Sequence, residues 1–161
     1  EGDTIASLRM PTLYCFKELK FKNKKQRQNY NRLVRNVKKT LPIAKEVNRA
    51  IIETYEFLQT LPNEKAREKH LQAVEKSVKE QYTPRMKKLT FSQGKLLIKL
   101  INRETDSSSY ELVKAFLGPF KAGFYQAFAA IFGASLKKEY HPEGEDAEIE
   151  RIVLLVESGQ I

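Results

Sequence analysis

Apolar residues recur every three or four positions along most of the chain after Asn23, which is the spacing of one face of an α-helix. Pro42 interrupts the longest of these series. Because proline is costly inside a helix but is well placed in a first turn, the pattern predicts either a kink at Pro42 or two helices nearly end to end, with Thr40 as the cap of the second. The series consists of Tyr30, Leu33, Val34, Val37, Leu41, Ala44, Val47, Ile51, Tyr55 and Leu58.

A second long helix is predicted to begin near Asn63, directly after Leu61-Pro62. Pro84 interrupts its apolar face, which resumes two residues later. Together the two long elements, residues 23–89, predict an antiparallel helical hairpin. The apolar face of this second helix consists of Leu71, Val74, Val78, Tyr82, Met86 and Leu89.

Residues 90–161 predict shorter and more apolar helices. Thr90 or Ser92 can cap the first of them, which carries Leu96, Leu97, Leu100 and Ile101. Further helices are predicted over residues 110–117, 120–133 and 146–157, the last ending at Gly159.

Residues 1–22 lack helical periodicity, so we expect an extended arm here, with or without a short strand. The stretch Leu13-Tyr14-Cys15-Phe16 is expected to anchor the arm to the helical body. The pattern as a whole predicts an all-α fold of about six helices, in a single domain that spans residues 1–161.

The length and composition are those of a globular protein that can bury a core. The chain has 161 residues, of which 41% are hydrophobic and 30% charged. Its single cysteine, Cys15, excludes an internal disulfide bond and a cysteine zinc site. The most apolar window, residues 122–136, contains Gln126 and falls short of the roughly 20 apolar residues that a membrane-spanning helix needs.

The formal net charge of +9 lies entirely in one segment. Between Lys17 and Lys39 ten basic residues stand against one acidic residue, Glu18, and the rest of the chain is neutral. Residues 143–157 have the opposite sign, with six acidic residues against Arg151. Either the two segments face each other and partly cancel, or the basic segment stays open for an anionic partner. The candidate binding residues are Lys24, Lys25, Arg27, Arg32, Arg35, Lys38 and Lys39.

No motif for a cofactor, a metal or a known catalytic centre stands out in the sequence. The acidic run 143–148 lacks the spacing of a calcium-binding EF-hand and is interpreted as a helix start, where acidic side chains complement the helix dipole. Glu104, which follows an apolar helix, is the one catalytic candidate, because it could supply one of the two carboxyl groups of a glycoside hydrolase. A structural ion pair between Arg103 and Glu104 is the simpler interpretation.

The basic segment also contains Tyr30 and several Asn and Gln residues, a composition found on nucleic-acid-binding surfaces. Tyr30, however, belongs to the apolar face and is expected to point inward. Since no nucleic-acid-binding motif accompanies it, we disfavour nucleic acid as the partner.

Several long strings of the sequence resemble an uncharacterised family of exported Bacteroidetes proteins, a domain of unknown function. The resemblance extends over nearly the whole chain. The strings are Glu1-Gly2-Asp3-Thr4-Ile5, Phe21 to Gln26, Tyr30 to Lys39, Leu89 to Ile101, Arg103-Glu104-Thr105, Ser109 to Lys114 and Pro142 to Asp146.

The resemblance implies a removed signal peptide and a periplasmic or cell-envelope location, and it implies no activity. The chain departs from the family's pattern where Asn102 and His141 replace Asp and where Tyr125 replaces Trp. The loss of two carboxylates weakens any interpretation as a metal or acid–base site.

The sequence therefore leaves two predicted functions. The first is a non-catalytic exported protein that uses its basic segment to bind an anionic surface, polymer or protein at the cell envelope. The alternative is a cell-wall glycan hydrolase with Glu104 as the acid. No cofactor is expected for either function.

Overall fold

The computed structural model describes residues 10, 12–106, 126–127, 129–131 and 140–161. Four helices with defined bounds lie in this part: α1 (Lys24–Thr60), α2 (Glu64–Met86), α3 (Phe91–Asp106) and α5 (Ala147–Glu157). Residues 126–127 and 129–131 are also helical, and the described residues contain no strand. The all-α prediction is thus confirmed. The predicted helix over 110–117 and most of that over 120–133 lie outside the described residues.

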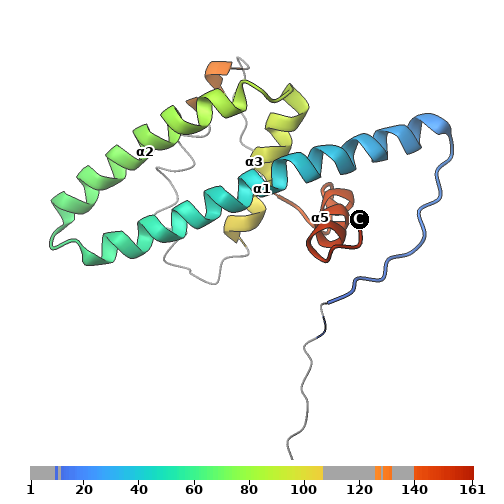
Figure 1. The fold of residues 1–161 in the computed structure, drawn as a ribbon, viewed down its shortest axis with the longest axis horizontal. Coiled ribbons are helices and arrows are strands. Elements are labelled where there is room, and N and C mark those ends of the chain that lie inside the picture. The colour runs from blue at the N-terminus through green and yellow to red at the C-terminus, as the bar shows by residue number, and fades with distance from the viewer. Residues whose placement is uncertain (1–9, 11, 107–125, 128, 132–139) are drawn as a thin grey trace, which may run out of the picture.

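Helices α1 and α2 run in opposite directions and diverge from the short turn that joins them, so the predicted hairpin is present (Figure 1). α3 crosses α1 near its middle, and α5 lies against the N-terminal half of α1 (Figure 1). α1 packs mainly on α3 and α5 and less on α2. It is therefore the central element of the described fold.

Pro42 does not divide α1, which continues through it for 37 residues. The alternative of two helices nearly end to end is therefore wrong. Thr40 is buried within α1, and its hydroxyl donates a hydrogen bond of 2.8 Å to the carbonyl of Asn36 instead of capping a helix. The missing hydrogen bond at Pro42 is outweighed because Val37 and Ala44, on either side of it, are completely buried.

Local side chains at residues 23, 63 and 90 cap three of these four helices. Asn23 and Asn63 each accept a hydrogen bond of 2.9 Å from the backbone three residues further on. Thr90 and Gln93 form a reciprocal capping box, in which each side chain accepts from the other's backbone N–H at 3.3 and 3.2 Å. The predicted starts near Asn23, Asn63 and Thr90 are confirmed.

The core lies where α1, α3 and α5 meet. Val47 of α1, Leu100 of α3 and Ile152 of α5 are all completely inaccessible to solvent. α2 adds residues from its C-terminal half, including Tyr82 and Met86. The contact between α2 and α1 is partly polar, because Arg85 of α2 donates two hydrogen bonds, of 2.7 and 3.0 Å, to the Glu46 carboxylate of α1.

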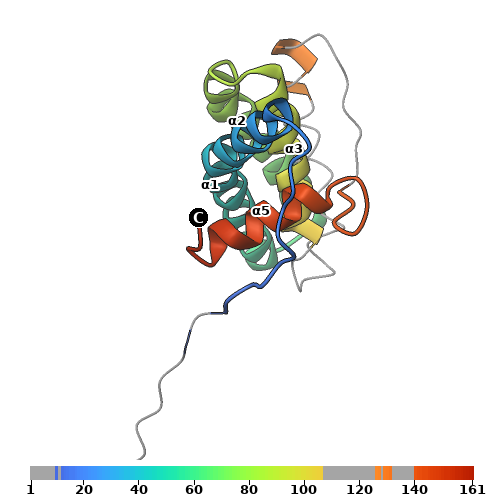
Figure 2. The same cartoon turned by 90° about the vertical axis from the view of Figure 1, so that its right-hand side faces the viewer.

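The arm that precedes α1 passes alongside α5 (Figure 2). Its residues 12–22 have no regular structure, so the strand that we allowed for is absent from them. The backbone of Tyr14 exchanges two hydrogen bonds, of 2.8 and 3.0 Å, with the Gln160 side chain. Arg151 donates to the Lys17 carbonyl at 2.8 Å and lies 4.9 Å from the centre of the Phe16 ring. The arm is thus attached by polar and cation–π contacts, whereas Leu13 and Phe16 stay exposed.

In the part of the chain that the structure describes, we find no helix with the length and apolar character needed to cross a membrane.

Candidate functional site

The seven candidate binding residues form one surface, which we call the basic face. All seven are exposed, and so are the other three basic residues between Lys17 and Lys22. At 3.6 residues per turn the seven project from α1 within an arc of about 160°, opposite the buried residues Val37, Leu41 and Ala44. The basic face consists of Lys24, Lys25, Arg27, Arg32, Arg35, Lys38 and Lys39.

The basic face is unfavourable for the stability of α1. The first turn of this helix contains Lys24, Lys25 and Arg27 and no acidic residue, although the helix dipole there favours negative charge. Further along, Arg35 has like-charged neighbours three or four positions away at Arg32, Lys38 and Lys39, an arrangement that costs a few tenths of a kcal/mol per pair. These charges therefore do not stabilise the helix that carries them.

Few partners occupy the basic face. Among the described residues no carboxylate forms an ion pair with it, and its two side-chain hydrogen bonds go to amides. Arg32 donates to Asn29 at 2.5 Å, and Lys39 donates to Gln93 at 3.2 Å, at the start of α3. The charge of this surface is left available to solvent.

The acidic segment 143–157 does not neutralise the basic face in the described structure. Its first half pairs with Lys99 of α3, whose ammonium lies 3.1 Å from Glu145 and 2.5 Å from Asp146. Asp146 is buried, and its second oxygen accepts a hydrogen bond of 3.1 Å from the backbone of His141. Burial lowers the pKa of Lys99, but its bonds to Asp146 and Glu145 outweigh this effect and raise the pKa overall. Lys99 therefore stays charged.

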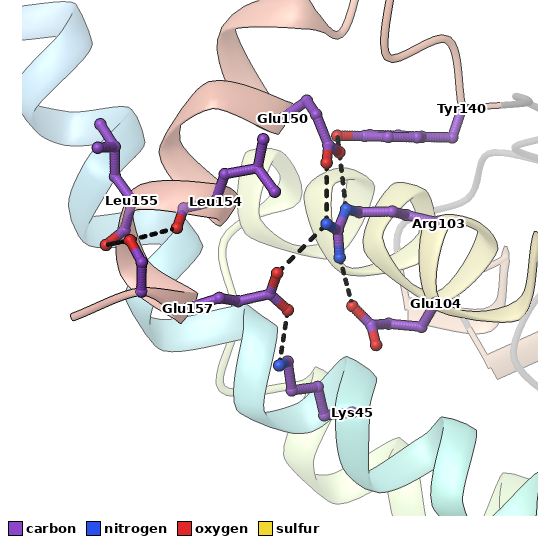
Figure 3. A network of polar contacts seen from close by, with 9 residues as sticks. Lys45, Arg103, Glu104, Tyr140, Glu150, Leu154, Leu155 and Glu157 are labelled. Carbon is purple, nitrogen blue, oxygen red and sulfur yellow. Dashed lines mark hydrogen bonds and ion pairs between the residues drawn. The ribbon is translucent and has the colours of Figure 1, made fainter. Parts of the chain in front are cut away.

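The second half of the acidic segment converges on Arg103 of α3 (Figure 3). The guanidinium donates two hydrogen bonds, of 2.7 and 2.8 Å, to Glu150, and it lies 3.3 Å from Glu157 and 2.8 Å from Glu104. Tyr140 donates to Glu150 at 2.7 Å. Lys45 of α1 lies 2.6 Å from Glu157, so the network joins α1, α3 and α5.

The side chains at the centre of this network are largely removed from water, with exposed fractions of 14% for Arg103 and 20% for Glu150. Burial raises the pKa of Glu150, but hydrogen bonds from Arg103 and Tyr140 outweigh it and hold the pKa below its ordinary value. Burial and the Glu150 carboxylate raise the pKa of Tyr140. Glu150 and Arg103 are therefore charged at neutral pH, whereas Tyr140 stays a neutral hydrogen-bond donor, and their contacts hold α5 on α3.

Glu104 lies within this network, paired with Arg103 at 2.8 Å. This is the structural ion pair that the sequence already suggested as the simpler interpretation. Its position beside Arg103 gives no support to the role of glycosidase acid, and the hydrolase alternative stays an untested prediction.

No metal centre forms in the described residues, where no three His, Cys, Asp or Glu side chains gather closely enough to hold an ion. Glu143 and Glu145 line an open surface hollow with His141 and Gly144. Cys15 is exposed on the arm. None of these positions adds a reactive group to the network around Arg103.

The sequence interpretation missed that Arg103 pairs with Glu150 and Glu157. One signal was present: Glu150 and Glu157 are seven residues apart, so they share a face of α5, and they are two of the three acidic residues of this helix. Only the placement of α5 beside α3 brings these carboxylates to Arg103, over 47 and 54 residues of sequence.

Residues 3–155 match the model of a family described as a domain of unknown function, DUF4294. No curated protein and no solved structure matches the chain.

Proposed function

We propose that this chain, which belongs to the DUF4294 family, is a non-catalytic protein of the cell envelope that binds an anionic partner through its basic face. One observation carries the proposal. Seven exposed cations share one side of α1, in positions that destabilise the helix, and no described carboxylate pairs with them. Charges that oppose local stability and have no structural partner are expected at functional surfaces.

The balance of charge across the molecule supports this interpretation. Four of the six acidic residues in segment 143–157 already have partners on α1, α3 or both, so the segment has little capacity left to mask the basic face. A local excess of positive charge raises the concentration of anions at the surface and accelerates their association. The envelope location rests on the resemblance of long sequence strings to exported proteins, and fractionation of cells that express the full gene product tests it.

Charge reversal tests the binding proposal. In a variant with Lys24, Lys25, Arg27 and Arg32 replaced by Glu, we expect affinity for polygalacturonate or for anionic vesicles at about 150 mM salt to fall more than about 100-fold, at roughly fourfold per lost contact. Isothermal titration or sedimentation measures this change. Glu in the first turn favours the helix dipole, so unfolding does not account for the loss.

The matched control replaces Lys65, Lys69, Lys87 and Lys88 by Glu. These four lysines are exposed and lie on or directly after α2. The control changes the net charge by the same amount and is expected to keep most of the affinity. Equal losses in both variants, or unchanged binding after reversal of the basic face, would contradict the proposal.

A further inference from the structure

The exposed residues of the N-terminal half of α1 are unusually uniform in chemistry. Between Lys24 and Lys39 every exposed residue is Lys, Arg, Gln or Asn. Gln26 and Asn29 are engaged locally, with the Lys22 backbone and with Arg32. Gln28 and Asn31 make no hydrogen bond to any other described residue and project among the cations. The surface thus offers charge together with amide groups that can both donate and accept hydrogen bonds.

This chemistry does not suit insertion into a lipid layer. Helices that lie in a membrane interface bury an apolar face beside their cations. None of the large exposed apolar side chains of the described structure lies among residues 24–39. They are Met10, Leu13 and Phe16 of the arm, together with Phe57, Phe91 and Ile161. The apolar side of this half of α1 is occupied instead by the core.

The shape of the basic face is also informative. It is a convex ridge about 22 Å long, from Lys24 to Lys39 at 1.5 Å per residue, whose side chains diverge over about 160°. A flat surface reaches only the middle of such a ridge, whereas a flexible chain can lie along it and reach both flanks. Arginine adds two-pronged contacts to carboxylate or phosphate groups.

From these observations, and building on the proposed function, we infer that the partner is a linear acidic polysaccharide that lies along α1. Its carboxylate or phosphate groups meet the seven cations, and its hydroxyl groups exchange hydrogen bonds with Gln28 and Asn31. The free hydroxyls separate this ligand from a layer of lipid headgroups that carry none, such as phosphatidylserine, and its flexibility separates it from a nucleic-acid duplex.

Oligogalacturonates of defined length, vesicles that contain phosphatidylserine and a 20-base-pair duplex DNA distinguish the three kinds of partner. We expect the affinity for oligogalacturonate to rise on the order of 100-fold between oligomers with two and with six carboxylates, at roughly fourfold per contact, and then to level off. With seven contacts, raising the salt concentration from 50 to 200 mM is expected to lower the affinity for long oligomers roughly 1,000-fold.

A neutral variant tests the role of the amides separately. Replacement of Gln28 and Asn31 by Ala leaves the charge unchanged, so we expect several-fold weaker binding of oligogalacturonate with the same salt dependence, and no change for vesicles. The control replaces Gln59 and Gln72, which are exposed on α1 and α2, by Ala. It is expected to change neither the binding of oligogalacturonate nor that of vesicles.

Several results would overturn the inference while the proposed function stands. These are tighter binding of vesicles or of duplex DNA than of oligogalacturonate at equal salt, an affinity independent of oligomer length, and identical binding by the Gln28 and Asn31 variant. If none of the three probes binds, or if reversal of the basic face has no effect on any of them, both the inference and the proposed function fail.

Discussion

Arg103 shows how much one residue can depend on its surroundings. Its guanidinium lies within 3.3 Å of carboxylate oxygens from Glu104, Glu150 and Glu157. Each of these charges would be costly to bury alone, since removal of one partner from a buried pair leaves an uncompensated charge. The sequence predicted the pair with Glu104. It could not predict the pairs with α5, because nothing local to residue 103 identifies a partner some 50 residues away.

The lowered pKa of Glu150 predicts a dependence of stability on acid. A carboxyl whose pKa is lower in the folded than in the unfolded state contributes stability above its unfolded value, near 4.5, and that stability is lost as the pH falls through the folded pKa. We expect Glu150→Gln to lower the free energy of unfolding at pH 7 by about 3 kcal/mol and to reduce its loss below pH 4.5. Urea denaturation followed by circular dichroism at several pH values measures both effects.

Glu148 gives the matched control, because it is exposed in the same turn of α5. Glu148→Gln is expected to stay within about 0.5 kcal/mol of the parent protein at every pH. If Glu150→Gln behaves in the same way, the network around Arg103 does not hold α5 in place.

At the scale of elements, the helix positions were largely predictable. Asn23, Asn63 and Thr90 mark helix starts in the sequence, because capping is a local interaction between side chain and backbone. Pro42 was harder to interpret, because its local cost competes with burial on both sides of it. The cost of a proline inside a helix favoured an interruption of α1 at Pro42, but the packing of α1 on α3 and α5 outweighs this cost.

Replacement of Pro42 by Ala tests this competition. The amide of the new residue can bond to the Lys38 carbonyl, whereas the unfolded chain becomes more flexible, so we expect a net gain of about 2 kcal/mol in the free energy of unfolding. Thermal or urea denaturation measures it. Pro62→Ala, in the turn between α1 and α2, restores no helical bond and should give no gain. A loss of stability in Pro42→Ala would mean that α5 requires the proline's local geometry.

At the scale of the whole molecule, charge is separated into a solvated basic face and a partly buried acidic network. Salt screens exposed charges far more than buried ones, with a Debye length of about 10 Å at 0.1 M. Screening should therefore relieve repulsion on the basic face and leave the contacts of Arg103 nearly intact. We expect the protein to gain about 1 kcal/mol of stability between 20 and 200 mM sodium chloride.

Thermal denaturation across this salt range measures the gain. In the variant with Lys24, Lys25, Arg27 and Arg32 replaced by Glu, four acidic positions precede the three remaining cations of the basic face, so the net repulsion along α1 falls and the gain should become smaller. A parent protein that salt destabilises would instead indicate that ion pairs, and not repulsion on the basic face, dominate its surface electrostatics.

The sequence by itself determined where the helices run and that all the excess positive charge lies between Lys17 and Lys39, because helical periodicity, capping and charge are properties of neighbouring residues. Only the tertiary structure decided which acidic groups remain free. Arg103 and Lys99 take up Glu150, Glu157, Glu145 and Asp146, since the packing of α5 on α1 and α3 brings together residues 46 to 54 positions apart. The periodicity of the sequence does not predict such distant pairings. Whether acidic residues cover the basic face could therefore be established only from the fold.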